Sequence, residues 1–167
     1  IHLISRNEPE LKELSEKVNS DFTVLDVLSE NFSEKLAQLK STDIKGIAYC
    51  IGSIDLKPIK MTKKSDYEKC FNLNFYPIVE VIKQFQENLK ENKGSVVLFS
   101  NHSIMASVKG ALEGLTVSLA AEFAPNIRIN CIAPSLTNSK IAQPILKSKV
   151  VADGIAKAHP MKRIGEG

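Results

Sequence analysis

Short apolar runs alternate with longer amphipathic stretches along this chain. The runs have the length and the β-branched content of buried strands, and they span residues 1–5, 22–25, 46–51, 94–100 and 128–132. The stretches between them repeat apolar residues at helical spacing, which predicts helices over residues 8–18, 32–39, 63–90, 109–123 and part of 140–157. This alternation predicts a parallel sheet with helices on both of its faces.

The residues that follow each predicted strand are the first candidates for a binding site. In a parallel sheet, ligands bind beyond the carboxyl ends of the strands, because all of these ends lie at one edge. In this chain the edge would be formed by Arg6, Asp26, Gly52, Asn101 and the segment that begins at Pro134.

Composition narrows the class of protein. Hydrophobic residues make up 43% and charged residues 25% of the 167 residues, which is typical of one globular domain. A formal net charge of +3 that is spread along the chain argues against a nucleic-acid partner. No apolar run reaches the roughly 18 residues of a membrane span. The three cysteines lack metal-site spacing, so we expect buried free thiols in a cytoplasmic protein.

Two segments are more specific than composition. Residues 109–125 read Lys-Gly-Ala-Leu-Glu-Gly-Leu-Thr-Val-Ser-Leu-Ala-Ala-Glu-Phe-Ala-Pro, and residues 127–134 read Ile-Arg-Ile-Asn-Cys-Ile-Ala-Pro. With Arg-Ile-Gly-Glu at 163–166, they resemble the short-chain dehydrogenase/reductase (SDR) family, beginning at that family's second strand. The resemblance implies one Rossmann-type domain over residues 1–167, a three-layer αβα sandwich with a doubly wound parallel sheet, without the family's first strand and glycine loop. It also implies a homodimer or homotetramer.

The resemblance assigns cofactor-binding roles to the first two strand ends. Arg6 stands where the family holds the 2′-phosphate of NADP, and a guanidinium suits a phosphate group. We therefore expect NADP, with NAD as the alternative cofactor. Asp26 and Val27 stand where the family meets the adenine ring, although an aspartate at this place also suits a turn or a helix N-cap.

The later strand ends would bind the nicotinamide half of the cofactor. Cys50 and Gly52 occupy the place of the family's Asn-Ala-Gly, and Gly52 would let the backbone approach the ribose. After the last strand, the resemblance places the backbone of the segment around the nicotinamide carboxamide and a hydroxyl near the pyrophosphate, which gives the candidates Pro134, Leu136, Thr137 and Ser139. The segment from residue 140 onward would be a substrate lid.

Lys109 matches the lysine of the family's Tyr-x-x-x-Lys motif. In that role it would bond the nicotinamide ribose and lower the pKa of a neighbouring acid through its positive charge. Asn74 matches the asparagine that helps to hold a water between this lysine and solvent. Asn101 falls at the position of the family's serine and could polarise a carbonyl, with Ser100 as the alternative.

The motif departs from the family at the position of its tyrosine. Met105 stands there, and a thioether cannot transfer a proton. His102 could act as the acid near neutral pH, or it is a loop residue without a chemical role. The family also separates its serine and tyrosine by a longer stretch than the four positions between Asn101 and Met105. We therefore expect that residues are missing between 101 and 102, and likewise before 1 and after 167.

These residues together predict an NADP-preferring oxidoreductase. It would transfer hydride between the nicotinamide and a small-molecule carbonyl or alcohol, with the cofactor supplying the hydride chemistry. Met105 favours the alternative of an NADP-binding sensor or scaffold with little or no catalysis. We expect neither a nucleic-acid partner nor membrane insertion.

Overall fold

The computed structural model describes residues 1–39, 43–53, 57–100 and 106–167. Parallel strands alternate with helices, as predicted, and single-turn 3-10 helices are formed by Ile59–Met61 and Lys140–Ala142. The strands are β1 (His2–Ser5), β2 (Asp21–Val24), β3 (Gly46–Tyr49), β4 (Ser95–Phe99) and β5 (Arg128–Ile132). The helices are α1 (Glu8–Val18), α2 (Phe32–Ala37), α3 (Lys64–Asn74), α4 (Tyr76–Glu91), α5 (Ala106–Phe123), α6 (Gln143–Leu146) and α7 (Lys149–Ala158).

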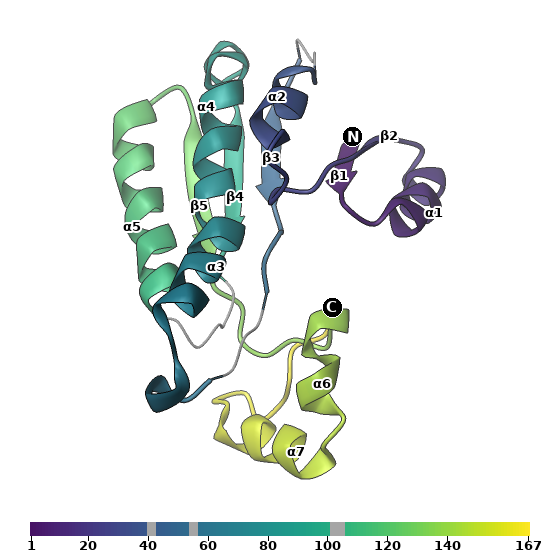
Figure 1. Ribbon diagram of the computed structural model, residues 1–167, viewed down its shortest axis with the longest axis vertical. Coiled ribbons are helices and arrows are strands. Elements are labelled where there is room, and N and C mark those ends of the chain that lie inside the picture. Colours follow the sequence, from purple (N-terminus) through teal and green to yellow (C-terminus); the bar gives the residue numbers. More distant parts are fainter. Residues whose placement is uncertain (40–42, 54–56, 101–105) are drawn as a thin grey trace.

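The strands form two parallel sheets instead of the single sheet that the sequence predicted. β1 pairs with β2, and β4 lies between β3 and β5. Figure 1 shows the β1–β2 sheet and α1 standing to one side of the three-stranded sheet. In the usual doubly wound order, the first strand lies between the second and the fourth. β1 and β3 match the family's second and fourth strands, so they are not expected to pair directly.

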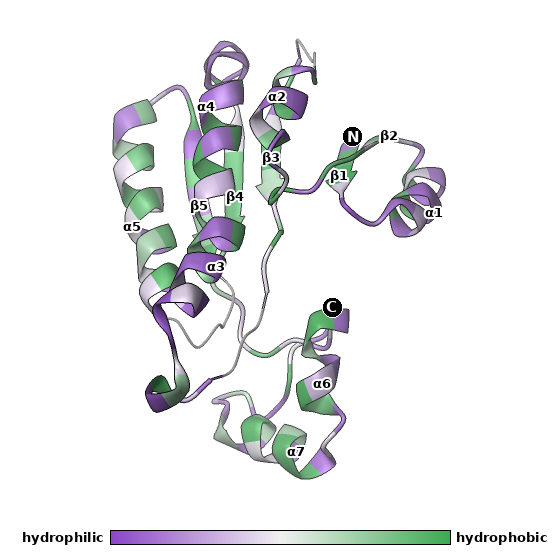
Figure 2. Ribbon diagram, viewed as in Figure 1, coloured by the Kyte–Doolittle hydropathy of each residue, from purple (hydrophilic) through white to green (hydrophobic). Residues whose placement is uncertain are grey.

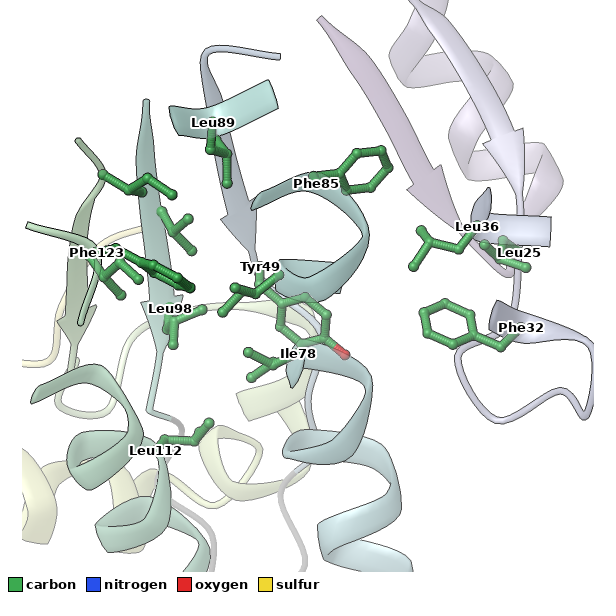
Figure 3. Packing of buried hydrophobic residues seen from close by; sticks show 14 residues of the cluster. Leu25, Phe32, Leu36, Tyr49, Ile78, Phe85, Leu89, Leu98, Leu112 and Phe123 are labelled. Carbon is green, nitrogen blue, oxygen red and sulfur yellow. The ribbon is translucent and has the colours of Figure 1, made fainter. Parts of the chain in front are cut away.

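The hydrophobic core lies between the three-stranded sheet and the helices α4 and α5. Val96 and Leu98 of β4 point into it and are fully buried, as is Leu89 of α4. Figure 3 shows this cluster extending past Tyr49 toward the helix α2. Burying each large aliphatic side chain contributes about 1.5–3 kcal/mol to the stability of the fold. This packing therefore fixes the positions of β3, β4 and β5, and with them the carboxyl ends of the three strands.

The long helix predicted over residues 63–90 is two helices, α3 and α4, which meet at Phe75. Phe75 has φ −117° and ψ −60°, outside regular helical geometry. Pro77 explains the break, because it has no N–H to bond the carbonyl of Leu73 and its ring collides with that turn. The break leaves Asn74 in the last turn of α3, where its side chain is buried.

Cysteine burial differs from the prediction at two of three positions. Cys70 is buried, but Cys131 is half-buried and Cys50 is exposed. Cys50 directly follows β3, where successive side chains alternate between faces. Tyr49 points into the helix-covered core, so Cys50 points to the opposite face, which the described residues leave uncovered.

None of the helices in the described part of the chain combines the length and the apolar composition that a membrane span needs.

Residues 138–164, which we call the α6–α7 unit, leave the sheet and return to nearly the same point. Thr137 and Gly165 form a parallel bridge. Asn138 N–H donates to Gly165 O at 2.8 Å, and Gly165 N–H donates to Leu136 O at 3.0 Å. A Cβ on Gly165 would lie 2.9 Å from Thr137 Oγ1, so a larger residue here would force the Thr137 side chain to shift. Figure 1 shows the unit beyond the end of the sheet toward which β3 points.

Candidate functional site

Arg6 lies directly after β1 with an exposed side chain. Within the described part of the chain, no carboxylate lies within ion-pair distance of its guanidinium. The neighbouring Asn7 caps α1, since its Oδ1 accepts a hydrogen bond from Glu10 N–H at 3.4 Å. Only Arg6 and Asn7 therefore separate the strand from the helix. Arg6 is an unpaired cation at the carboxyl edge of the β1–β2 sheet.

Asp26 has a structural role at the end of the second strand. Its Oδ1 accepts a hydrogen bond from Leu28 N–H at 2.9 Å, and its carbonyl accepts one from the Ser29 hydroxyl at 2.7 Å. These bonds are those of an aspartate turn, which was the alternative role considered for this residue. Val27 lines a hollow of about 290 Å³ that also touches Phe32 and Tyr76.

Asn74 connects the loop after β3 to the helix α3. Its Oδ1 accepts a hydrogen bond from Ser53 N–H at 3.3 Å. Its Nδ2 donates to Cys70 O at 2.8 Å and lies 3.4 Å from Cys70 Sγ. Gly52, next to Ser53, is half-buried. Nothing in the sequence indicated Ser53, because its part in the site depends on a contact across 21 positions.

Ser100 is fully buried at the end of β4, and its Oγ has no hydrogen-bond partner among the described residues. Its N–H donates to Ile132 O at 2.9 Å, which extends the β4–β5 ladder by one residue.

Burial raises the pKa of the Cys131 thiol, which lies near Ser100, although hydrogen bonds involving Thr116 and the Ser100 backbone lower it. The thiol is therefore protonated and uncharged at neutral pH.

Lys109 is the fourth residue of α5 and lies at the end of its first turn. Its side chain is 30% exposed, and Nζ lies 4.0 Å from Glu113 Oε1. Lys109 and Glu113 both act electrostatically on Cys131, which places the lysine near the carboxyl half of β5. Asn101, His102 and Met105 lie outside the described residues, so their arrangement around Lys109 is not described.

The segment after β5 supplies hydroxyl groups at the same edge. Thr137 Oγ1 donates to Ser135 O at 3.0 Å, and Ser139 precedes the 3-10 turn that begins the α6–α7 unit. Pro134 and Leu136 are half-buried in this segment. No cluster of metal-binding side chains occurs among the residues that the structure describes.

The donor set at this edge suits an anionic dinucleotide. Arg6 and Lys109 supply two cations, and Thr137 and Ser139 supply hydroxyls. Phosphate groups prefer guanidinium and hydroxyl donors of this kind. The residues present therefore fit NADP by their chemistry, while Asp26 is already engaged by its own turn.

Comparisons with known proteins give the family of this chain. The family model described as "Enoyl-(Acyl carrier protein) reductase" matches residues 1–167. A chloroplastic tropinone reductase homologue of Arabidopsis thaliana is 30% identical over 99% of this chain and 58% of its own length. A second homologue from this plant is 28% identical over 99% of this chain and 70% of its own length. The chain thus spans less than two thirds of the first of these relatives. That alignment runs over 186 positions against 167 residues here, so at least 19 positions hold a residue only in the relative.

Solved structures show the same architecture. A short-chain type dehydrogenase/reductase from Mycobacterium ulcerans superposes with a TM-score of 0.87 at 19% identity, covering 99% of this chain and 68% of that one. ElxO with NADP bound superposes with a TM-score of 0.84 at 25% identity, covering 99% and 75%. The fold is accordingly Rossmann-like, as predicted. The match of the family model over residues 1–167 shows that the chain belongs to the short-chain dehydrogenase/reductase family of oxidoreductases.

Proposed function

We propose that this protein is an NADP-preferring oxidoreductase that transfers hydride between the nicotinamide and a small-molecule carbonyl or alcohol. The observation that carries the proposal is the position of Lys109 near the carboxyl half of β5, in a chain that matches the family model throughout. ElxO, which is 25% identical, has NADP bound. The unpaired Arg6 at the first strand end supports the choice of NADP over NAD.

Each candidate residue has a separate task in this proposal. The nicotinamide, when bound, accepts or supplies the hydride. Arg6 binds the 2′-phosphate, and the hydroxyls of Thr137 and Ser139 bind the pyrophosphate. Lys109 holds the ribose and favours the ionised form of a neighbouring acid. Asn74 positions the loop that holds Gly52 against the cofactor.

Proton transfer and polarisation of the carbonyl fall to the segment after β4. Met105 cannot transfer a proton, so we assign the acid to His102, whose ordinary pKa lies near neutrality. Asn101 or Ser100 donates a hydrogen bond to the carbonyl oxygen. The interruption between Asn101 and His102 is part of this proposal, because the family's own serine and tyrosine are further apart than Asn101 and Met105 are here.

Cofactor titration followed by turnover tests this function. NADPH fluorescence should change saturably on adding the protein, and a panel of aliphatic and cyclic ketones should contain at least one that oxidises NADPH. No binding would remove the proposal. Binding without turnover of any ketone would favour the sensor or scaffold alternative, which no comparison supports at present.

Replacing Arg6 by alanine should weaken NADPH binding and leave NADH binding unchanged. A charge-assisted contact to phosphate is worth roughly 1.5–3 kcal/mol, so we expect a loss of about ten-fold or more in the affinity for NADPH. Arg128→Ala is the matched control, because Arg128 is exposed at the opposite, amino end of β5. Equal losses of affinity for NADPH and NADH would show that Arg6 does not bind the 2′-phosphate.

The exposed side of α5 supports a homodimer or homotetramer. A Cβ placed on Gly110 or on Gly114 would meet nothing within 4 Å. Val117, on the same side, is 73% exposed. Small residues flanking an exposed valine allow the helix of a second copy to approach closely, and we propose this side of α5 as the subunit interface.

A further inference from the structure

The α6–α7 unit carries the excess of positive over negative charge in the protein. Its 27 residues contain six basic side chains and a single carboxylate, that of Asp153, and the remaining 140 residues hold sixteen basic and eighteen acidic side chains. The basic residues are Lys140, Lys147, Lys149, Lys157, Lys162 and Arg163. The unit is therefore strongly cationic, while the rest of the chain is slightly acidic.

Most of these charges lack an acidic partner. Lys140 pairs with Glu10 of α1 at 3.1 Å. Across the ranges that the structure describes, the other five basic side chains have no carboxylate within ion-pair distance. Lys162 instead donates to the carbonyl of Lys157 at 2.8 Å. Their combined field is thus directed at solvent, where it attracts anions.

The same unit exposes apolar side chains. No residue of α7 is fully buried, and Val150 and Val151 are 82% and 46% exposed. Met161, just after the helix, is also exposed. Figure 2 shows α7 as mainly hydrophobic along its length. Exposed apolar surface bordered by unpaired lysines is suited to a ligand that is both apolar and anionic.

The position of the unit connects this surface to the candidate site. Its two ends meet at the Thr137–Gly165 neck, three residues after Pro134. The unit therefore starts and ends beside the segment that we propose to bind the nicotinamide. A substrate whose carbonyl reacts there would have the α6–α7 unit next to its remaining part.

We propose that the α6–α7 unit binds the non-reacting part of the substrate, and that this part is an amphiphilic anion, an apolar chain that ends in a carboxylate or a phosphate. The inference rests on the proposed function, because it takes the reaction to occur beside the neck. Val150, Val151 and Met161 contact the chain, and Lys147, Lys149 and Lys157 attract its anionic end.

Binding of simple probes to the protein, with isotope-labelled methionine methyl groups, tests this without turnover. Decanoate and decyl phosphate should shift the Met161 methyl signal saturably, and decanol should bind roughly five-fold more weakly, as expected for a few screened charge contacts. Raising the salt concentration should remove the difference. Lys147→Gln/Lys149→Gln/Lys157→Gln should remove it too, whereas Lys17→Gln/Lys64→Gln/Lys83→Gln, with the same loss of charge on α1, α3 and α4, should retain it.

Several results would overturn the inference. These are equal affinities for decanoate and decanol, a perturbation of Met61 in place of Met161, and binding only to anionic phospholipid vesicles. Loss of the Met161 shift on dilution to a monomer would instead assign the face to a second copy of the chain. Failure of NADPH titration with an intact decanoate preference would reject the proposed function, and with it the substrate role of the unit, while its binding of amphiphilic anions would stand. NADPH turnover of neutral ketones without any such preference would reject only the substrate class.

Discussion

Replacing Lys109 by alanine is expected to lower kcat by about two to four powers of ten, the range by which a positioned acid–base group accelerates a reaction. The loss follows from removing both the ribose contact and the cation that favours ionisation of the neighbouring acid. Stability should change little, because the side chain is partly exposed and its 4.0 Å contact with Glu113 is weak. The measurements are NADPH oxidation with a reactive ketone and the thermal midpoint of unfolding.

Two further variants separate a catalytic lysine from a structural one. Glu113→Gln removes the partner of Lys109 and should leave kcat within a few-fold of the original. Lys83→Ala removes an exposed lysine on α4 and should have no effect. Full turnover in Lys109→Ala would show that the match to the family's lysine is coincidental, whatever the fold.

Local chemistry made most of the secondary structure predictable. The predicted ranges of α1 and β5 agree with the structure at both ends. Asn7 and Pro9 mark the start of α1, and Pro134 follows β5 closely. The break at Phe75 was missed although Pro77 was visible, because apolar spacing continues through it. The spacing of apolar residues shows which side chains face the core. It does not change where a proline such as Pro77 removes one backbone hydrogen-bond donor.

The division into two sheets could not be predicted from local pattern. Strand pairing depends on which edges meet, and period-two alternation carries no information about this. We propose that one further strand belongs between β1 and β3, because the doubly wound order places the family's first strand there. Such a strand would cover β1 and β3, most of whose residues are partly or fully exposed.

Only the site residues that closely follow a strand could be predicted from the sequence. Arg6, Gly52 and the Pro134 segment follow from the rule that parallel strands bind ligands at their carboxyl ends. The contacts of Ser53 with Asn74 and of Thr116 with Cys131 join distant positions, so no local motif marks them. The roles of Asn101, His102 and Met105 stay predictions, since these residues lie outside the described ranges.

Replacing Asn74 by leucine should lower both stability and activity. Leucine is of similar size, but it leaves the part-buried Ser53 N–H without its acceptor. A fully buried unpaired donor costs about 1–3 kcal/mol of unfolding free energy, so we expect a loss near the lower end of this range. The loop that holds Gly52 would then lose its tether to α3. Because small displacements of positioning groups reduce rates strongly, we expect kcat/KM to fall by about ten-fold or more. Denaturant unfolding and NADPH-dependent turnover measure the two effects.

Asn72 supplies the matched control, because it lies on the same helix two residues away and is exposed. Asn72→Leu makes the same chemical change on the opposite side of α3, so stability and kcat/KM should both be nearly unchanged. Equal losses in the two variants would indicate a general effect on α3. A loss of stability in Asn74→Leu without a loss of kcat/KM would mean that the Ser53 contact supports the fold only. A loss of both stability and kcat/KM in Asn74→Leu, but not in Asn72→Leu, would identify Asn74 as the residue that connects α3 to the site. The break at Phe75 makes this contact possible, because it sets the last turn of α3 against the loop after β3.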